Sequence, residues 1–310
     1  MTIGLWALTL ILVVLAFLLL VSAAIFCAAF VRFPKRAEEK LEAREDPEPL
    51  INEGVRWIRE QNCKKVEIRS YDGLRLAARV LPAENAKGTL ILIHGYRSPM
   101  YHDFSCILPF YHALGYNLLI PSQRTHGESE GKYICYGIRE RYDCKAWAAF
   151  AESYFEPGGD IFLGGVSMGS ATVLMASDLT LPDTVRGIIA DCGFTSPYEE
   201  FVYLLKRSHV PIHPLMDLVA LYARLFAGYR FRDCSTLTCV SDTKLPILFV
   251  HGREDHTVPF FNGTRLHKLY QGPKDFLFVD GARHVESMYM DPAGYAQKLD
   301  HMMETYFYGI

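Results

Sequence analysis

The chain has 310 residues, of which 50% are hydrophobic and 22% are charged, and its net charge is −3. This size and composition suit one large folded domain plus an appendage, and they exclude extensive disorder. The small negative charge gives no electrostatic basis for binding nucleic acid.

Eight cysteines are scattered along the chain, without a Cys-x-x-Cys pair or a Cys/His cluster. Zinc sites depend on such spacings, so a zinc site is not expected. Unpatterned cysteines in a long chain also fit a reducing compartment better than a disulfide framework.

Residues Ile3–Val31 are almost wholly apolar, and no charged residue precedes Arg32. About twenty such residues can cross a bilayer, so residues 1–33 are predicted to be a single-pass anchor in the cell membrane. A cleaved signal peptide is the alternative, with Ser22-Ala23-Ala24 as its small-residue exit. The apolar residues continue past that point, which favours an uncleaved transmembrane helix.

The basic residues near this segment all follow it: Arg32, Lys35, Arg36, Lys40 and Arg44. The positive-inside rule then places the rest of the chain on the cytoplasmic side, with an extracytoplasmic domain as the alternative. Residues 34–64 are charged and helix-prone, with breaks at Pro47 and Pro49. They are interpreted as a tether and a helix leading into the next domain, although a solvated spacer is the simpler explanation.

From Lys65 onward, short apolar runs alternate with helix-compatible segments. The first two runs flank Asp72-Gly73, a hairpin signal, which predicts an antiparallel pair at the start of the sheet. The predicted strands are Val66–Tyr71, Leu74–Leu81, Thr89–Ile93, Tyr116–Ile120, the run ending at Val166, Val185–Ala190, Leu245–Val250 and Asp275–Val279. The predicted helices are Asp103–Leu114, Ile138–Phe155, the segment after Ser167, Pro259–Tyr270 and Pro292–Tyr308. Residues 65–310 are therefore predicted to form an α/β domain with a mainly parallel, doubly wound sheet.

Residues 196–244 interrupt this alternation and are too long for one connection. They contain two helical stretches, near Tyr198–Arg207 and His213–Ala227, that are rich in aromatic residues. We interpret them as a small helical cap over the site, although ordinary helices packed on the sheet would also fit. Three tyrosines are candidates for lining the substrate pocket: Tyr198, Tyr203 and Tyr222.

The motif Gly165-Val166-Ser167-Met168-Gly169 joins a predicted strand to a predicted helix. In this context Gly-x-Ser-x-Gly is typical of a nucleophile held in a sharp, strained turn, where close neighbours must lack a Cβ atom. The start of the following helix directs free N–H groups at an oxyanion formed there. Ser167 is therefore the candidate nucleophile.

A serine nucleophile needs a base, and that base needs an acid to orient it. His284 follows the last predicted strand and Asp255 follows the strand before it, so the order Ser167, Asp255, His284 is the one this arrangement uses. Asp191 and Glu254 are the competing acids. Asp191 ends a strand that lies one too early, and Glu254 is one position out of register.

The oxyanion hole needs two backbone donors. We expect the N–H groups of Met168, directly after the nucleophile, and of Tyr96, in the loop after Ile93. The side chain of His94 is expected to be structural. Arg124, His126 and Ser129 are expected to brace a polar turn at the end of a strand, with substrate contact as the minority interpretation.

Across residues 65–310 the chain resembles the α/β-hydrolase superfamily. The matching segments are His94-Gly95-Tyr96, Arg124-x-His126-Gly127-x-Ser129, Gly165-x-Ser167-x-Gly169, His251-Gly252-x-x-Asp255-x-x-Val258-Pro259 and Gly281-x-x-His284. More narrowly, it is similar to membrane-anchored bacterial hydrolases grouped with serine aminopeptidase-like and monoacylglycerol-lipase-like enzymes. The resemblance implies the fold, the triad Ser167/Asp255/His284 and the oxyanion donors Tyr96 and Met168, but no substrate. The sequence has Gln123 where many relatives have an aspartate before the arginine, so an ion pair within that turn is not assumed.

These features predict a membrane-anchored serine hydrolase that cleaves small-molecule carboxylic esters through an acyl-enzyme, without a cofactor or a nucleic-acid partner. Peptide cleavage from a free N-terminus is the alternative activity. It would need carboxylates to hold an ammonium group, and the candidates Glu199-Glu200 are more simply explained as a solvated helix face. A catalytically silent membrane-bound binding protein is the remaining alternative, which an intact triad argues against.

Overall fold

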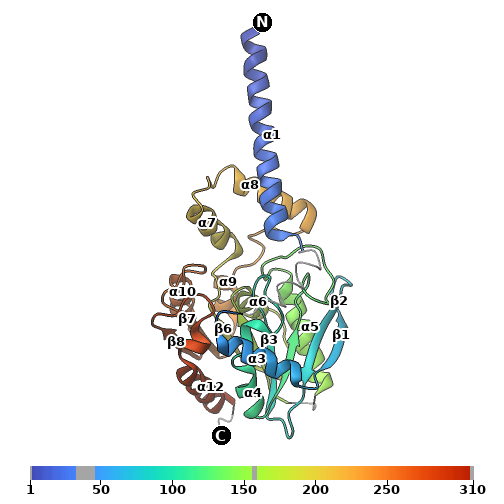
Figure 1. The fold of residues 1–310 in the computed structure, drawn as a ribbon, viewed down its shortest axis with the longest axis vertical. Helices are drawn as coiled ribbons and strands as arrows, with labels where there is room; N and C mark the ends of the chain where they lie inside the picture. Colours follow the sequence, from blue (N-terminus) through green and yellow to red (C-terminus); the bar gives the residue numbers. More distant parts are fainter. Residues whose placement is uncertain (1, 33–45, 156–158, 308–310) are drawn as a thin grey trace.

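The computed structural model describes residues 2–32, 46–155 and 159–307. An eight-stranded sheet forms its centre, with the strand order β1-β2-β4-β3-β5-β6-β7-β8 (Figure 1). The strands are β1 (Lys64–Arg69), β2 (Arg75–Leu81), β3 (Gly88–Ile93), β4 (Tyr116–Pro121), β5 (Ile161–Val166), β6 (Val185–Asp191), β7 (Ile247–Gly252) and β8 (Lys274–Val279). The β1–β2 and β2–β4 pairs are antiparallel and the other pairs are parallel, which confirms the predicted sheet.

Helices cover both faces of the sheet, and each face has its own apolar core. The helices of the first core are α5 (Glu140–Tyr154), α6 (Met168–Ala176), α9 (Thr236–Asp242) and α10 (Phe261–Leu269). Those of the second are α3 (Pro49–Glu60), α4 (Leu108–Ala113), α11 (Ser287–Met290) and α12 (Pro292–Phe307). In β3, Ile91 and Ile93 point into the first core, whereas Leu90 and Leu92 point into the second, as the period-2 alternation of a strand requires.

Helix α3 corresponds to the predicted leading helix, and it packs closely against the helices on one face of the sheet. Its buried side chains include Ile51 and Ile58. A Cβ atom at Gly54 would lie 1.9 Å from the carbonyl oxygen of Ser105, so the two backbones are in direct contact there. Residues 34–45 of the predicted tether, and residue 33 of the predicted anchor, lie outside the described residues.

The predicted helix Asp103–Leu114 is wrong, because it is broken into two pieces. A 3₁₀ turn, η1 (His102–Phe104), is followed by α4, which restarts with Pro109 in its first turn. Proline has no N–H group and its ring clashes with the preceding turn, so it is tolerated at a helix start but not inside a helix. The sequence analysis also missed the short helices α9 and α11.

The long apolar segment forms α1 (Thr2–Phe30), which is long and apolar enough to cross a membrane. It extends away from the sheet, and its C-terminal part lies beside α8 (Leu215–Tyr222) (Figure 1). The other elements of residues 196–244 are α7 (Pro197–Arg207), the π-helical turn η2 (Ala223–Ala227) and α9. A third apolar cluster joins the end of α1 to α6, α7 and α8 and contains Phe26, Phe30, Met168 and Phe201.

Candidate active site

Ser167 lies in the sharp turn between β5 and α6. Its backbone angles are φ 54° and ψ −116°, which are strained for a residue with a side chain. A Cβ atom at Gly165 would lie 2.3 Å from the carbonyl oxygen of Gly169, and one at Gly169 would lie 1.8 Å from that of Ile93. The turn therefore exists only because both flanking residues are glycines.

Three side chains from three loops meet at this turn. The imidazole Nε2 of His284 lies 2.9 Å from the Ser167 hydroxyl, and its Nδ1 lies 2.7 Å from Oδ2 of Asp255. With Nδ1–H donating to the carboxylate, Nε2 is left to accept the serine hydroxyl. The predicted Ser167, His284 and Asp255 are thus brought together in one hydrogen-bonded series.

The other oxygen of Asp255 accepts the backbone N–H groups of Thr257 and Val258, at 2.8 and 2.9 Å. Burial alone would raise the pKa of Asp255, but hydrogen bonds from His251 and His284 outweigh burial and hold the pKa below its usual range. The carboxylate is therefore charged at neutral pH and fixed in orientation.

Neither competing acid takes the position of Asp255 beside His284 Nδ1. Asp191 is buried at the end of β6, where burial raises its pKa to about 7, and within the described residues no hydrogen bond joins it to His284. Glu254 is exposed, and its Oε2 lies 4.0 Å from Nε2 of His256. Cys192 brings its sulfur within 4.8 Å of ligand atoms of Asp255 and His284, but burial raises the pKa of this thiol well above its usual value.

The loop after β3 runs beside the nucleophile. A Cβ atom at Gly95 would lie 3.4 Å from Cβ of Ser167, so the backbone that leads to Tyr96 closely approaches the turn. Met168 is the first residue of α6, where N–H groups have no acceptor within the helix. Asp103 accepts the Gly95 N–H at 2.6 Å and holds this loop. Asp103 belongs to no motif, so the sequence does not predict this contact.

Two buried histidines brace the loops as expected. His94 Nδ1 contacts the Gly95 carbonyl at 2.8 Å, and its Nε2 accepts the N–H of Gln123 at 3.1 Å. His126 Nε2 accepts the N–H of Arg97 at 3.0 Å. Burial lowers the pKa of His94 and lowers that of His126 to about 3, so both rings are neutral. The bracing role predicted for this turn is confirmed for His126, and also for Ser129, whose hydroxyl donates to the Ser122 carbonyl at 2.6 Å.

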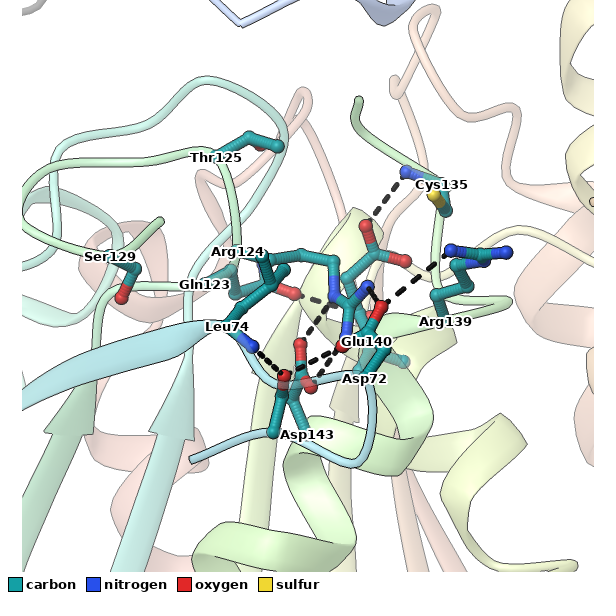
Figure 2. A network of polar contacts seen from close by, with 12 residues as sticks. Asp72, Leu74, Gln123, Arg124, Thr125, Ser129, Cys135, Arg139, Glu140 and Asp143 are labelled. Carbon is teal, nitrogen blue, oxygen red and sulfur yellow. Dashed lines mark hydrogen bonds and ion pairs between the residues drawn. The ribbon is translucent and has the colours of Figure 1, made fainter. Parts of the chain in front are cut away.

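Arg124 forms its ion pairs with residues of other elements, outside its own turn. Its guanidinium makes bidentate contacts to Asp143 of α5 at 2.6 and 2.7 Å, and it also reaches Asp72 of the β1–β2 hairpin at 3.0 Å (Figure 2). Burial alone would lower the pKa of Arg124, but the hydrogen bonds and charge of Asp143 raise it, so the group stays charged. Glu140 completes the network by accepting the N–H groups of Cys135 and Gly137.

The three tyrosines predicted to line the substrate pocket have separate surroundings. The hydroxyl of Tyr203 donates to the His256 carbonyl, next to Asp255, at 3.0 Å. Tyr222 donates to the Leu19 carbonyl in α1 at 3.1 Å, and the Tyr198 ring lies under Arg232. Their place in a substrate pocket stays a prediction.

The expected solvated face at Glu199-Glu200 is wrong for one of the two residues. Glu199 is exposed and pairs with Arg265 at 2.9 Å. Glu200 is buried, and burial together with the charge of Asp255 raises its pKa to about 8. Glu200 shares its helix face with Tyr203 and Arg207, both of which bond to the carbonyl of His256.

Comparison with known proteins gives matches over most of the chain. YqkD of Bacillus subtilis, an uncharacterized protein, is 28% identical over 218 residues, which cover 70% of this chain and 71% of that protein. The uncharacterized membrane protein YNL320W of Saccharomyces cerevisiae is 26% identical over 211 residues, or 67% of each chain. Among solved structures, the Pyrococcus furiosus esterase Pf2001 has a TM-score of 0.63 at 22% identity, covering 79% of this chain and 91% of that one.

A profile of the alpha/beta hydrolase family matches residues 90–298, which include Ser167, Asp255 and His284. The match extends over more than half of the sequence and over β3 to β8 of the sheet. The chain therefore belongs to the alpha/beta hydrolase family.

Proposed function

We propose that the protein is a serine hydrolase that cleaves carboxylic esters through an acyl-enzyme intermediate. The observation that carries this proposal is the hydrogen-bonded series from Ser167 through His284 to Asp255 at the strained turn. A serine hydroxyl is a weak nucleophile until a neighbouring base accepts its proton, and the base needs a fixed acid to orient it.

In the first step, His284 Nε2 takes the hydroxyl proton as Ser167 Oγ attacks the acyl carbon, and the carbonyl electron pair moves onto oxygen. The N–H groups of Tyr96 and Met168 stabilise that oxyanion. His284 then returns its proton to the leaving alcohol as the ester C–O bond breaks. In the second half, His284 takes a proton from a water molecule as the water oxygen attacks the acyl carbon. It then gives that proton to Ser167 Oγ as the bond between the acyl group and Oγ breaks and the acid leaves. No cofactor takes part.

The charge on Asp255 is central to this cycle. Its lowered pKa keeps the carboxylate ionised over the working pH range, so it stabilises the imidazolium that forms when His284 takes the proton. Its two backbone hydrogen bonds prevent it from turning away from the ring.

The surroundings of Glu199 and Glu200 favour ester substrates over peptides with a free N-terminus. Glu199 is already paired with Arg265, and the raised pKa of Glu200 leaves it largely protonated at neutral pH. Neither offers a free anion for a substrate ammonium group. Pf2001, which shares the fold, is an esterase.

The proposal divides the chain into an anchor (residues 1–33), a tether with its leading helix (34–64) and a catalytic domain (65–310) with a cap at 196–244. The anchor makes the protein a single-pass membrane protein. The yeast relative YNL320W is also called a membrane protein.

The test uses the full chain in detergent with p-nitrophenyl esters from acetyl to palmitoyl. We expect Ser167→Ala to lower the hydrolysis rate by about 10⁴-fold or more on the preferred ester, because the triad acts as a unit. Ser177→Ala, a serine at the other end of α6, is the matched control and should retain most of the activity.

A fluorophosphonate probe separates an enzyme from a binding protein. It should label the parent chain and the Ser177→Ala variant but not Ser167→Ala. Labelling that persists in Ser167→Ala would refute the assignment of the nucleophile. Labelling at Ser167 without turnover on any ester, but with release of N-terminal amino acids from peptides, would establish the peptidase alternative instead.

A further inference from the structure

Helix α1 changes its surroundings halfway along its length. From Gly4 to Phe17 its side chains are exposed on every side. From Leu18 onward one face is covered, at positions spaced three or four residues apart that include Ser22, Phe26 and Phe30. This spacing is that of one helical stripe, and it is covered by the cap and by the segment that contains Tyr133 and Tyr136.

The exposed part is too short to cross a bilayer by itself. The 14 residues Gly4–Phe17 rise about 1.5 Å each, or about 21 Å, whereas a hydrocarbon core is about 30 Å thick. Counted from the first residue of α1, Thr2, a span of about twenty residues ends near Val21 and includes Leu19. Tyr222 of α8 donates its hydroxyl to the Leu19 carbonyl within that stretch. Helix α8 thus lies alongside a part of α1 that has to be inside the membrane or at its boundary.

The outer surface of α8 and η2 is apolar at this level. Leu221, Leu225 and Phe226 are 44%, 63% and 58% exposed. Phe226 lies 6.1 Å from Phe26 of α1 between ring centroids, so this surface is continuous with the surface of the anchor. Arg224, exposed in the same turn, has the long side chain that can reach lipid phosphates from an interfacial position.

We propose that Leu221, Leu225 and Phe226 form a second membrane-contact surface, which inserts into the interface of the same bilayer that α1 spans. Large exposed apolar side chains mark such contacts, and an amphipathic segment that carries a basic residue suits the boundary between acyl chains and headgroups. The bilayer is the occupant that fits, because α1 already fixes the surface at that depth.

This placement brings the candidate active site to the membrane side of the domain. The carbonyl oxygen of Ala29, at the end of α1, accepts the hydroxyls of both Tyr96 and Tyr136 at 2.9 Å. Phe30 stacks on Phe201 of the cap with ring centroids 4.9 Å apart. Tyr96, whose backbone N–H is assigned to the oxyanion hole, is thus hydrogen-bonded through its hydroxyl to the C-terminal end of α1. On the proposed function, the site takes amphiphilic acyl esters that reach it from the bilayer.

The experiment measures tryptophan quenching in the full chain, reconstituted into phosphatidylcholine vesicles with brominated acyl chains. Phe226→Trp adds a reporter on the surface, and Phe276→Trp adds one at an exposed phenylalanine of β8, away from α1 (Figure 1). The fluorescence of the added tryptophan is the difference between each variant and the parent chain. We expect the brominated lipid to quench this difference in Phe226→Trp and to leave it unchanged in Phe276→Trp. Equal quenching at the two positions would overturn the proposal.

Trp6 of α1 keeps the anchor and the second surface distinguishable. The difference between the parent chain and Trp6→Phe reports whether α1 itself is in the bilayer. Quenching of Trp6 without quenching in Phe226→Trp overturns the second surface alone. If neither tryptophan is quenched, the anchor is overturned as well. Fluorophosphonate labelling of the same vesicles tests the nucleophile separately, because quenching does not depend on catalysis.

An activity measurement tests delivery from the membrane. In Leu225→Asp/Phe226→Asp we expect the rate on a long-chain ester dispersed in the vesicles to fall about tenfold, equivalent to about 1.4 kcal/mol, with the rate on p-nitrophenyl acetate unchanged. Leu269→Asp, an exposed leucine at the end of α10, is the control and should leave both rates unchanged. An unchanged rate on the vesicle ester would overturn delivery from the bilayer. If the rates on the vesicle ester and on p-nitrophenyl acetate fell together, the quenching in Phe226→Trp would decide whether this surface contacts the bilayer.

Discussion

Glu200 is a carboxyl group in the cap that folding removes from water. Burial, with the nearby charge of Asp255, raises its pKa to about 8. Between its ordinary pKa and that value, the folded state keeps a proton that the unfolded chain has lost. The free energy of unfolding must therefore decrease as the pH rises through this window, from about 4.5 to 8.

Glu200→Gln removes this proton linkage, because an amide does not titrate. We expect the stability advantage of the variant over the parent chain to grow from near zero at pH 5 to about 2–4 kcal/mol at pH 8. The measurement is the unfolding temperature of the full chain in detergent, followed by tryptophan fluorescence. Buried Asp191 titrates in both proteins and cancels in the difference.

Glu199→Gln is the matched control, since Glu199 is the exposed neighbour on the same helix. Its difference from the parent chain should stay flat across the same pH range. If the Glu200→Gln and Glu199→Gln curves were parallel, Glu200 would not be the titrating group.

At the scale of residues, the sequence was sufficient to predict the side chains that lie together at the candidate site when each of them belongs to a motif. Ser167, Asp255 and His284 each follow a strand that an apolar run identifies, so their order and spacing located them. Asp103 could not be found this way, because its function depends on a contact with Gly95 that only the folded chain creates. The burial of Glu200 also depends on tertiary packing, although its spacing to Tyr203 and Arg207 marks a common face.

The end of α1 shows how an element can belong to two environments. Phe17 and Phe30 lie on the same helix, but Phe17 is 64% exposed and Phe30 is fully buried. Phe30 packs among Tyr136, Phe201 and Phe231. Beyond it, Val31 pairs with Tyr133 as a β-bridge and Arg97 donates to the Val31 carbonyl at 3.0 Å.

Phe30→Ala should therefore destabilise the catalytic domain, whereas Phe17→Ala should not. Truncating a buried aromatic side chain costs about 3–5 kcal/mol, which predicts a clear fall in the unfolding temperature of the full chain in detergent. Hydrogen exchange should also increase at Ile134, whose N–H bonds to the Phe30 carbonyl at 2.8 Å. Equal unfolding temperatures for the two variants would show that α1 is only loosely attached to the domain.

At the scale of elements, periodicity predicted the strands within a few residues but not the form of the cap. The stretch His213–Ala227 was expected as one helix, and the structure has α8 followed by the π-helical turn η2. Helix α8 begins only after Pro214. The contact between this region and α1 joins residues about 200 positions apart, and local patterns carry no information about it.

At the scale of the whole molecule, the residues that the structure describes form three apolar clusters, and the third of them is shared by α1 and the segment 196–244. If α1 spans a membrane as proposed, it does more than fix the protein there. Because α1 is packed against α8, the orientation of the α/β domain follows from the orientation of α1. On this proposal, the charges that flank the apolar segment determine the side of the membrane for the chain as a unit.

Those charges predict that the α/β domain is cytoplasmic, because five basic residues lie within fifteen residues after the apolar segment: Arg32, Lys35, Arg36, Lys40 and Arg44. The thiols make an independent prediction. All eight cysteines are free, and the sulfurs of Cys234 and Cys239 lie only 3.2 Å apart, so an oxidising compartment would readily join them.

A C-terminal fluorescent-protein fusion should be bright and an alkaline phosphatase fusion inactive. Mass spectrometry after denaturing alkylation should find the thiols of Cys234 and Cys239 both modified. Active phosphatase together with a Cys234–Cys239 disulfide would place the domain outside. Because the two measurements depend on different physics, charge at the translocation step and redox poise afterwards, their agreement would establish the side.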